Sequence, residues 1–211
     1  MAADPVTSER IYALLKADLM SGVYSPGEVL VERRIASDFG ISISPVRACA
    51  YRLVGERMLE LNVGGGFRVP EVTEAGLRDL YFWHGQLVRN SVNAGDQFAM
   101  ERGLQSAVHS SFADTAAMAR GLFERIAIRS ANAEILAAIR SAGERLHVAR
   151  LRESSVMPGI DDELAAVQTL TEEGSGHDLL RAMWAYHRRR LRRIPELVAA
   201  VHRPLDRNLS S

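Results

Sequence analysis

The segment from Pro26 to Val69 constrains the fold of this chain more than any other part. A Pro-Gly turn opens it, and a helix-like stretch over residues 31–39 follows. Gly40 closes that stretch, because the left-handed residue that often ends a helix is best supplied by glycine. A second helix is expected to begin with Ser44 as its N-cap and Pro45 in the first helical position. The two helices are therefore separated by a sharp turn of only a few residues.

A glycine-rich ribbon follows these helices. Residues 59–61 and 67–69 alternate in the manner of strands, and the glycine triplet at 64–66 lets the backbone between them turn at positive φ. Pro70 ends the ribbon. Two short helices followed by a two-stranded ribbon with a glycine tip predict a winged helix-turn-helix, a unit that holds one helix in the major groove of DNA.

The rest of the chain has a helical pattern. A first helix, capped by Thr7 or Ser8 and ended by Gly22, precedes the winged unit. Beyond it we expect helices over residues 73–93, 96–110, 112–129, 133–152, 161–173 and 177–193, with a short tail over 195–201. The predicted fold is mainly α, with a winged helix-turn-helix domain over 1–70 and an all-α antiparallel helical bundle over 71–211.

Composition narrows the class of protein. Hydrophobic residues make up 47% of the 211 residues, which is ample for a buried core. The apolar runs are too short to span a bilayer, and residues 1–10 lack the pattern of an export signal, so we expect a cytoplasmic protein without a membrane partner. The single cysteine, Cys49, excludes a disulfide framework and a cysteine-based zinc site, and its place on an apolar helix side indicates a buried small side chain.

Candidate DNA contacts rest on pattern, because the 26 basic and 26 acidic residues balance. Arg47 lies one turn into the second helix, opposite its apolar stripe, where it can reach a guanine edge or a phosphate. Hydroxyls of Ser42 and Ser44 suit phosphate oxygens, Arg33 lies over the DNA backbone, and the tip at 64–66 approaches the minor groove. The alternative is that the arginines are solvated surface charges and Ser44 only a cap. The combination of cap, arginine and glycine wing favours DNA binding.

These motifs resemble the GntR family of bacterial transcription regulators. The match is carried by Pro26-Gly27-Glu28-Val29-Leu30, Ser42-Ile43-Ser44-Pro45-Val46-Arg47, Arg52-Leu53 and Gly65-Gly66-Phe67-Arg68-Val69. The helical remainder resembles the FCD-type effector-binding bundle of the FadR branch. The resemblance implies a homodimer that binds a pseudo-palindromic double-stranded DNA operator, usually as a repressor, and that senses a small-molecule effector. It implies DNA contacts at Arg33, Ser42, Ser44, Arg47, Gly65 and Gly66.

Two positions depart from the family pattern. Ile43 stands where the family usually has an arginine, and Ala48 stands where a glutamate commonly follows the reading arginine. Loss of one reading arginine costs roughly 1–3 kcal/mol of binding free energy. We therefore expect an altered operator preference or a weak affinity.

The resemblance also implies a metal site that this chain lacks. Many relatives hold a divalent metal through an aspartate and three histidines, which align here with Ala119, Phe123, Leu164 and His187. Only His187 can bind a metal, and one imidazole does not make a site of useful affinity. We predict no family-type metal centre and no cofactor.

The interior of the bundle has several candidate ligand-binding residues. His84, His147 and His187 are candidates for a substitute metal site, although spacing alone does not bring them together. His84 also takes the place of an arginine that relatives direct at an acidic effector. A small-ligand pocket would be lined by Tyr81, Trp83, His84, Phe123, His147, Trp184 and His187. The alternative is that the aromatic side chains simply fill the core.

Other functions have less support. The sequence lacks paired carboxylates at bundle-metal spacing, a phosphate loop and a nucleophile motif, so we do not expect an enzyme. The basic run at 188–193 is interpreted as a solvated helix C-terminus. The leading prediction is a DNA-binding regulator with an effector domain, and the alternative is a DNA-binding dimer whose bundle has lost ligand and metal sensing.

Overall fold

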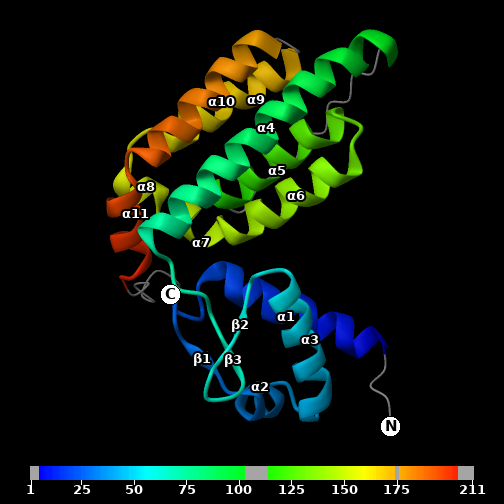
Figure 1. Ribbon diagram of the computed structural model, residues 1–211, viewed down its shortest axis with the longest axis vertical. Coiled ribbons are helices and arrows are strands. Elements are labelled where there is room, and N and C mark those ends of the chain that lie inside the picture. Colours follow the sequence, from blue (N-terminus) through cyan, green and yellow to red (C-terminus); the bar gives the residue numbers. More distant parts are fainter. Residues whose placement is uncertain (1–4, 103–113, 174–175, 204–211) are drawn as a thin grey trace. The chain divides into compact units, whose positions relative to one another are not determined.

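The computed structural model describes residues 5–102, 114–173 and 176–203 (Figure 1). The chain divides into two compact units. The first runs to Val72 and includes His202, and the second extends from Thr73 to Val201. None of the helices in the described ranges combines the length and the apolar character that a bilayer crossing needs.

The first unit contains three helices and a small antiparallel sheet. The helices are α1 (Pro5–Ser21), α2 (Glu32–Asp38) and α3 (Ile43–Gly55), and the strands are β1 (Val29–Leu30), β2 (Glu60–Leu61) and β3 (Phe67–Arg68). The strand order is β1-β3-β2, and Leu30 and Leu61 both lie opposite Phe67. The sheet therefore has one strand more than the predicted two-stranded ribbon, because Val29–Leu30, just before α2, pairs with β3.

Apolar side chains from every element meet in the core of the first unit. Helix α3 packs against both α1 and α2. Leu15 of α1 and Val46 and Leu53 of α3 are fully buried, and Phe67 of β3 joins them. Burial of each such side chain contributes about 1.5–3 kcal/mol. One side of α3 is thus committed to this core.

The second unit is entirely helical in its described ranges. Its helices are α4 (Glu74–Arg102), α5 (Thr115–Arg129), α6 (Ala133–Arg145), α7 (His147–Arg150), α8 (Glu153–Val156), α9 (Ile160–Glu173), α10 (Gly176–Leu191) and α11 (Ile194–Val201). Helix α4 packs against α5, α6, α10 and α11. Asp114 and Asn132 cap α5 and α6 by accepting hydrogen bonds from backbone N–H groups. The predicted fold class, a winged helix-turn-helix followed by a helical domain, is confirmed.

Several predicted boundaries are wrong. The expected break around residues 93–95 is absent, because α4 continues through it, and buried Gly95 lies against α5, where an added Cβ would be 3.5 Å from Cβ of Arg129. The expected helix over 133–152 is divided into α6 and α7, and α8 begins at Glu153. Parts of the expected helices over 96–110 and 112–129 lie outside the described residues.

Candidate functional site

The exposed side of α3 is the candidate DNA-binding surface. Ser44, Arg47 and Tyr51 are exposed at a spacing of three and four residues, so they share one face of the helix. Val46 and Leu53 on the other side are fully buried. The helix therefore presents a hydroxyl, a guanidinium and a phenol to solvent, and it is anchored from behind by the core.

Arg47 is held in place by the helix before it. Its Nε donates to Oε1 of Glu32 in α2 over 2.9 Å, and its side chain is 55% exposed. This hydrogen bond raises the pKa of Arg47, so the guanidinium is always charged. The pair engages Nε, so the Nη1 and Nη2 groups at the tip of the side chain remain for a base edge or a phosphate.

The start of α3 differs from the prediction by two residues. Ser42, not Ser44, is the N-cap, with extended backbone angles of φ −75° and ψ 161°, and Pro45 is the third helical residue. The Ser42 hydroxyl makes no capping hydrogen bond to the backbone N–H groups at the start of α3. Ser44 and Arg33 are exposed, on the first turn of α3 and on α2 respectively.

The wing is a tight turn that depends on two glycines. Gly65 and Gly66 have φ values of 91° and 78°, as expected from the sequence. The Asn62 N–H donates to the Gly66 carbonyl, and its side-chain amide donates to the Gly65 carbonyl over 3.0 Å. Val63 is fully exposed at the tip. Neither Asn62 nor Val63 was expected to have a role here, although asparagine is a common turn residue because its side chain hydrogen-bonds nearby backbone.

Arg52, also in α3, faces away from this surface. Its guanidinium carbon lies 3.6 Å from the ring centroid of Tyr12 in α1, and its Nη1 donates to Glu9 over 2.8 Å. A longer contact of 3.5 Å joins it to Glu56. Arg52 is half-exposed but is used as a link between α3 and α1, whereas Arg47 lies on the face that also carries Ser44 and Tyr51.

Two of the histidines expected in the bundle are in contact. His84 Nδ1 lies 2.8 Å from His187 Nε2, and His187 Nδ1 lies 2.7 Å from the Met183 carbonyl. Since a carbonyl only accepts, His187 Nδ1 must donate to it, and its Nε2 then accepts from His84. His84 Nε2 accepts in turn from Arg150 Nη2 over 3.3 Å. Gly85 allows this approach, because an added Cβ would be 3.1 Å from His187 Cγ.

Both histidines of this chain of hydrogen bonds are neutral. Burial lowers the pKa of His187 to about 3. Burial, with the positive charge of Arg150 as a second cause, lowers the pKa of His84 well below its ordinary value. Phe123 lies against both rings, with its centroid 4.6 Å from that of His84. A phenyl ring therefore packs against both imidazoles.

A buried ionic network uses Tyr81, another candidate pocket residue. Its hydroxyl donates to Glu153 over 2.7 Å, and Glu153 also accepts two hydrogen bonds from Arg190. Arg190 further donates to Glu163 over 2.7 Å. Arg190 and Glu153 are both almost completely inaccessible to solvent. Tyr81 is thus committed to a structural network.

The remaining candidates are not gathered around these groups. Trp184 and Trp83 are exposed on the outside of the bundle, whereas His147 is buried, with an Nδ1 that has no hydrogen-bond partner in the described residues. Burial lowers the pKa of His147 as well. The described residues contain no group of three or more His, Cys, Asp or Glu side chains placed to hold a metal ion.

Arg150 is a residue of the bundle interior that was not predicted from the sequence. Its side chain is 1% exposed, and its Nε and Nη1 have no hydrogen-bond partner among the described residues. The guanidinium lies 5.0 Å from the Phe123 ring centroid and donates through Nη2 to His84. A charge at this depth without a carboxylate partner is energetically unfavourable. No local pattern in the sequence distinguishes this arginine from Arg145 and Arg152, which are only partly buried.

Comparison with known proteins agrees with the geometry of the first unit. Residues 7–69 match the family model described as bacterial regulatory proteins, gntR family. The Uxu operon regulator of Haemophilus influenzae is 39% identical over 70 residues, which are 33% of this chain and 26% of that protein. The transcriptional regulator McbR of Escherichia coli is 36% identical over 66 residues, 31% of this chain and 30% of that protein. The alignments with curated relatives cover 26% to 34% of those relatives' length.

Solved structures extend the comparison to the whole fold. A GntR-type transcriptional regulator from Rhodococcus sp. RHA1 superposes with a TM-score of 0.70 at 15% identity, over 90% of this chain and 98% of that one. The structure of E. coli McbR/YncC superposes with a TM-score of 0.64 at 16% identity, over 90% and 97% of the two chains. At these identities the likeness concerns the fold. The sequence match over residues 7–69 shows that the N-terminal unit is a helix-turn-helix domain of the GntR family of bacterial transcriptional regulators.

Proposed function

We propose that this chain is a homodimeric, sequence-specific transcriptional regulator of the FadR branch that represses by binding a pseudo-palindromic operator. One observation carries the proposal. Helix α3 of a GntR-type domain buries one side in the core and presents Ser44, Arg47 and Tyr51 on the other. A helix anchored in this way can enter the major groove without loss of its packing.

The candidate DNA contacts of the first unit each have a role in this proposal. The Nη groups of Arg47 bind a guanine edge or a phosphate, because the guanidinium presents two parallel donors. Ser42, Ser44 and Arg33 bind phosphates and set the register of the domain on DNA. The wing at Gly65 and Gly66 approaches the minor groove, since a backbone without side chains can lie close to it.

The homodimer is supported by an exposed aromatic surface on the second unit. Phe82 and Trp83 are adjacent in α4, and both side chains are more than half exposed. Large aromatic side chains on a surface commonly mark a protein interface. A twofold dimer would also place two α3 helices in successive major grooves, which a pseudo-palindromic operator requires.

A small-molecule effector is proposed for the bundle interior, and Arg150 is the observation that supports it. Two of its donor atoms lack partners among the described residues, and its third reaches His84. An acidic effector would supply the missing negative charge. The alternative is that the bundle only dimerises, and the Phe123 ring packed against His84 and His187 favours this interpretation. An effector changes DNA binding only if its affinity differs between the two arrangements of the dimer.

Selection of bound duplexes from a random pool tests the DNA-binding proposal. We expect enrichment of an inverted repeat whose half-sites lie about one helical turn apart. Light scattering of the free protein should give twice the mass of one chain. Failure to enrich any sequence at low ionic strength, or enrichment of a single half-site by a monomer, would contradict the proposal.

Thermal-shift measurements with small carboxylic acids separate the effector proposal from its alternative. A ligand that occupies the interior should raise the melting temperature of the protein and fail to do so in Arg150→Met, which keeps an apolar side chain of similar length. If no acid stabilises the protein, the bundle serves dimerisation alone.

A further inference from the structure

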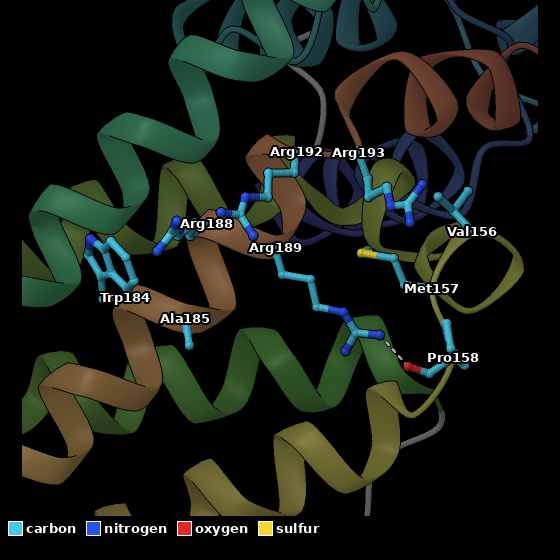
Figure 2. Close-up of a pocket in the computed structure, with 9 residues that line it drawn as sticks. All are labelled: Val156, Met157, Pro158, Trp184, Ala185, Arg188, Arg189, Arg192 and Arg193. Atoms are coloured by element: carbon cyan, nitrogen blue, oxygen red, sulfur yellow. Dashed lines mark hydrogen bonds between the residues drawn. The ribbon is translucent and has the colours of Figure 1, made fainter.

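An arginine-rich pocket opens on the outside of the second unit, on the side of α10 that faces the end of α8. The cavity has a volume of about 410 Å³. Figure 2 shows the side chains that line it: Val156, Met157, Pro158, Trp184, Ala185, Arg188, Arg189, Arg192 and Arg193. Its volume lies within the range of small-molecule sites, which is roughly 300–1,000 Å³.

Two of the four arginines are used by the fold. Arg189 donates to the carbonyl of Pro158, drawn as a dashed line in Figure 2, and to Glu163 over 3.3 Å. Arg193 pairs with Glu196 over 2.9 Å. The Arg189 contacts join α10 to the start of α9, and the Arg193 pair lies within the turn that leads into α11.

Arg188 and Arg192 are different, because neither has a carboxylate partner among the described residues. Arg188 lies in the last turn of α10, and Arg192 follows just beyond its end, where its N–H donates to the Arg188 carbonyl over 3.2 Å. Like charges four residues apart on a helical turn repel each other. Trp184 lies one turn earlier on the same face, and the Arg188 guanidinium carbon is 4.5 Å from its ring centroid. The pocket thus joins two uncompensated positive charges to a large aromatic surface.

Trp184 gives the pocket an apolar part in addition to its positive charge. Its side chain is 59% exposed, and Met157 and Pro158 form the facing part of the lining. A basic helix C-terminus is favourable in itself, as expected from the sequence, but it needs neither a cavity nor an exposed indole. An indole next to paired guanidinium groups suits a ligand with a flat ring and a phosphate, since the ring stacks and the phosphate accepts from arginine.

We propose that this pocket binds a phosphorylated small molecule with a planar ring, of the nucleotide class, through Trp184, Arg188 and Arg192. The site is separate from the proposed DNA-binding surface and from the bundle interior around Arg150. Arg188 and Arg192 bind the phosphate groups, and the ring lies against the indole. Binding neutralises the repulsion between the two arginines.

Trp184 makes the site directly measurable. The protein contains two tryptophans, so Trp83→Phe leaves Trp184 as the only one. Titration of this full-length variant with ADP should change the indole fluorescence in a saturable way, and calorimetry on the unaltered protein should give the same Kd. Adenosine and inorganic phosphate, which each carry one half of the recognised chemistry, should bind at least about tenfold more weakly than ADP.

Paired substitutions test the arginines. Replacement of both Arg188 and Arg192 by alanine should raise the Kd for ADP at least about tenfold, because a charged hydrogen bond is lost at each position. Arg89→Ala, an exposed arginine of α4 outside the lining, should leave the Kd unchanged. The proposal is overturned if ADP gives no saturable signal, if phosphate alone binds as tightly as ADP, or if Arg89→Ala weakens binding as much as the double variant.

Discussion

Replacing Arg47 by alanine should weaken operator binding strongly and leave the fold intact. Its side chain is 55% exposed, and its ion pair with Glu32 lies at the surface. Exposed pairs of this kind contribute little to stability, because solvent screens them and two side chains must be ordered. We therefore expect a melting temperature close to that of the unaltered protein.

The effect on DNA binding follows from the removal of one guanidinium at each half-site. Loss of an arginine that reads a base raises Kd by about 5- to 150-fold for one half-site. A twofold dimer carries the substitution twice, so the two effects multiply to about 25-fold or more when the half-sites act independently. If Arg47 binds a guanine, the effect falls on the selected operator and less on unrelated duplexes.

Arg52 provides the matched control, because it lies on the same helix and its removal changes the net charge equally. Its guanidinium stacks on Tyr12 and pairs with Glu9, so it links α3 to α1. Arg52→Ala should lower the melting temperature by a few degrees, since it removes the cation–π contact with Tyr12; the exposed pair with Glu9 adds little. Its affinity for the operator should remain within about twofold of the unaltered protein at matched salt.

Fluorescence anisotropy with the selected operator, at fixed ionic strength, measures both affinities, and thermal unfolding measures both stabilities. Arg47→Ala should lose affinity for the operator and keep its melting temperature, whereas Arg52→Ala should keep its affinity and melt at a lower temperature. The assignment of Arg47 to the DNA surface is refuted if Arg47→Ala binds like the unaltered protein, or if Arg52→Ala loses as much affinity as Arg47→Ala while it remains folded.

Three further predictions concern stability. Gly66→Ala should destabilise the first unit by about 1–2 kcal/mol, because its φ of 78° is unfavourable for a side chain, whereas Gly64→Ala should cost less in the same urea titration. The pKa of His187 is about 3 in the folded chain against 6.5 unfolded, so the unfolded state binds more protons between these values. His187 alone should then lower the free energy of unfolding by roughly 1 kcal/mol for each pH unit between 6.5 and about 3, and His187→Gln should remove this part of the slope. Glu153→Gln should cost about 3 kcal/mol or more in chemical unfolding, because buried Arg190 loses most of its charge compensation; a near-neutral result would show that the network is not needed.

Local patterns predicted the first unit well because its structure depends on local chemistry. The apolar stripe opposite Arg47 was expected to be the inner side of α3, and its Val46, Cys49 and Leu53 side chains are buried. Gly65 and Gly66 were expected to turn at positive φ, and both do. The start of α3 was misplaced because Ser42 and Ser44 are equally good caps by residue type, and only the backbone decides between them. Tyr51 was overlooked, although the helical period that found Arg47 places it four residues later on the same face.

The second unit was predicted less well, because distant residues decide its structure. Asn93-Ala94-Gly95 resembles a helix stop, but α4 continues through it. Gly95 has no side chain, so its backbone packs closely against Arg129 of α5, and this packing keeps the segment in the helix. Nothing in the sequence around residue 95 shows that α5 lies there.

The interior of the bundle could not be derived from sequence, because pairing between helices determines it. Tyr81 and His187 were both candidates for one pocket, with a filled core as the alternative; Tyr81 bonds to Glu153 and His187 bonds to His84. Arg150 belongs to a helix of four residues, too short for a periodic pattern to indicate burial. Its role emerges only from the atoms around it.

The hydrogen bonds from Arg150 through His84 and His187 to the Met183 carbonyl all run in one direction. One end of this series of hydrogen bonds is the Met183 carbonyl of α10, which only accepts. The other end is Arg150, whose Nε and Nη1 have no partner among the described residues. A molecule that bound the Arg150 guanidinium and drew its Nη2 away would leave His84 Nε2 without its donor. The hydrogen bonds of both imidazoles would then change. The occupied and empty proteins would then differ in how α4, α7 and α10 hold one another, so one local event would affect three helices together.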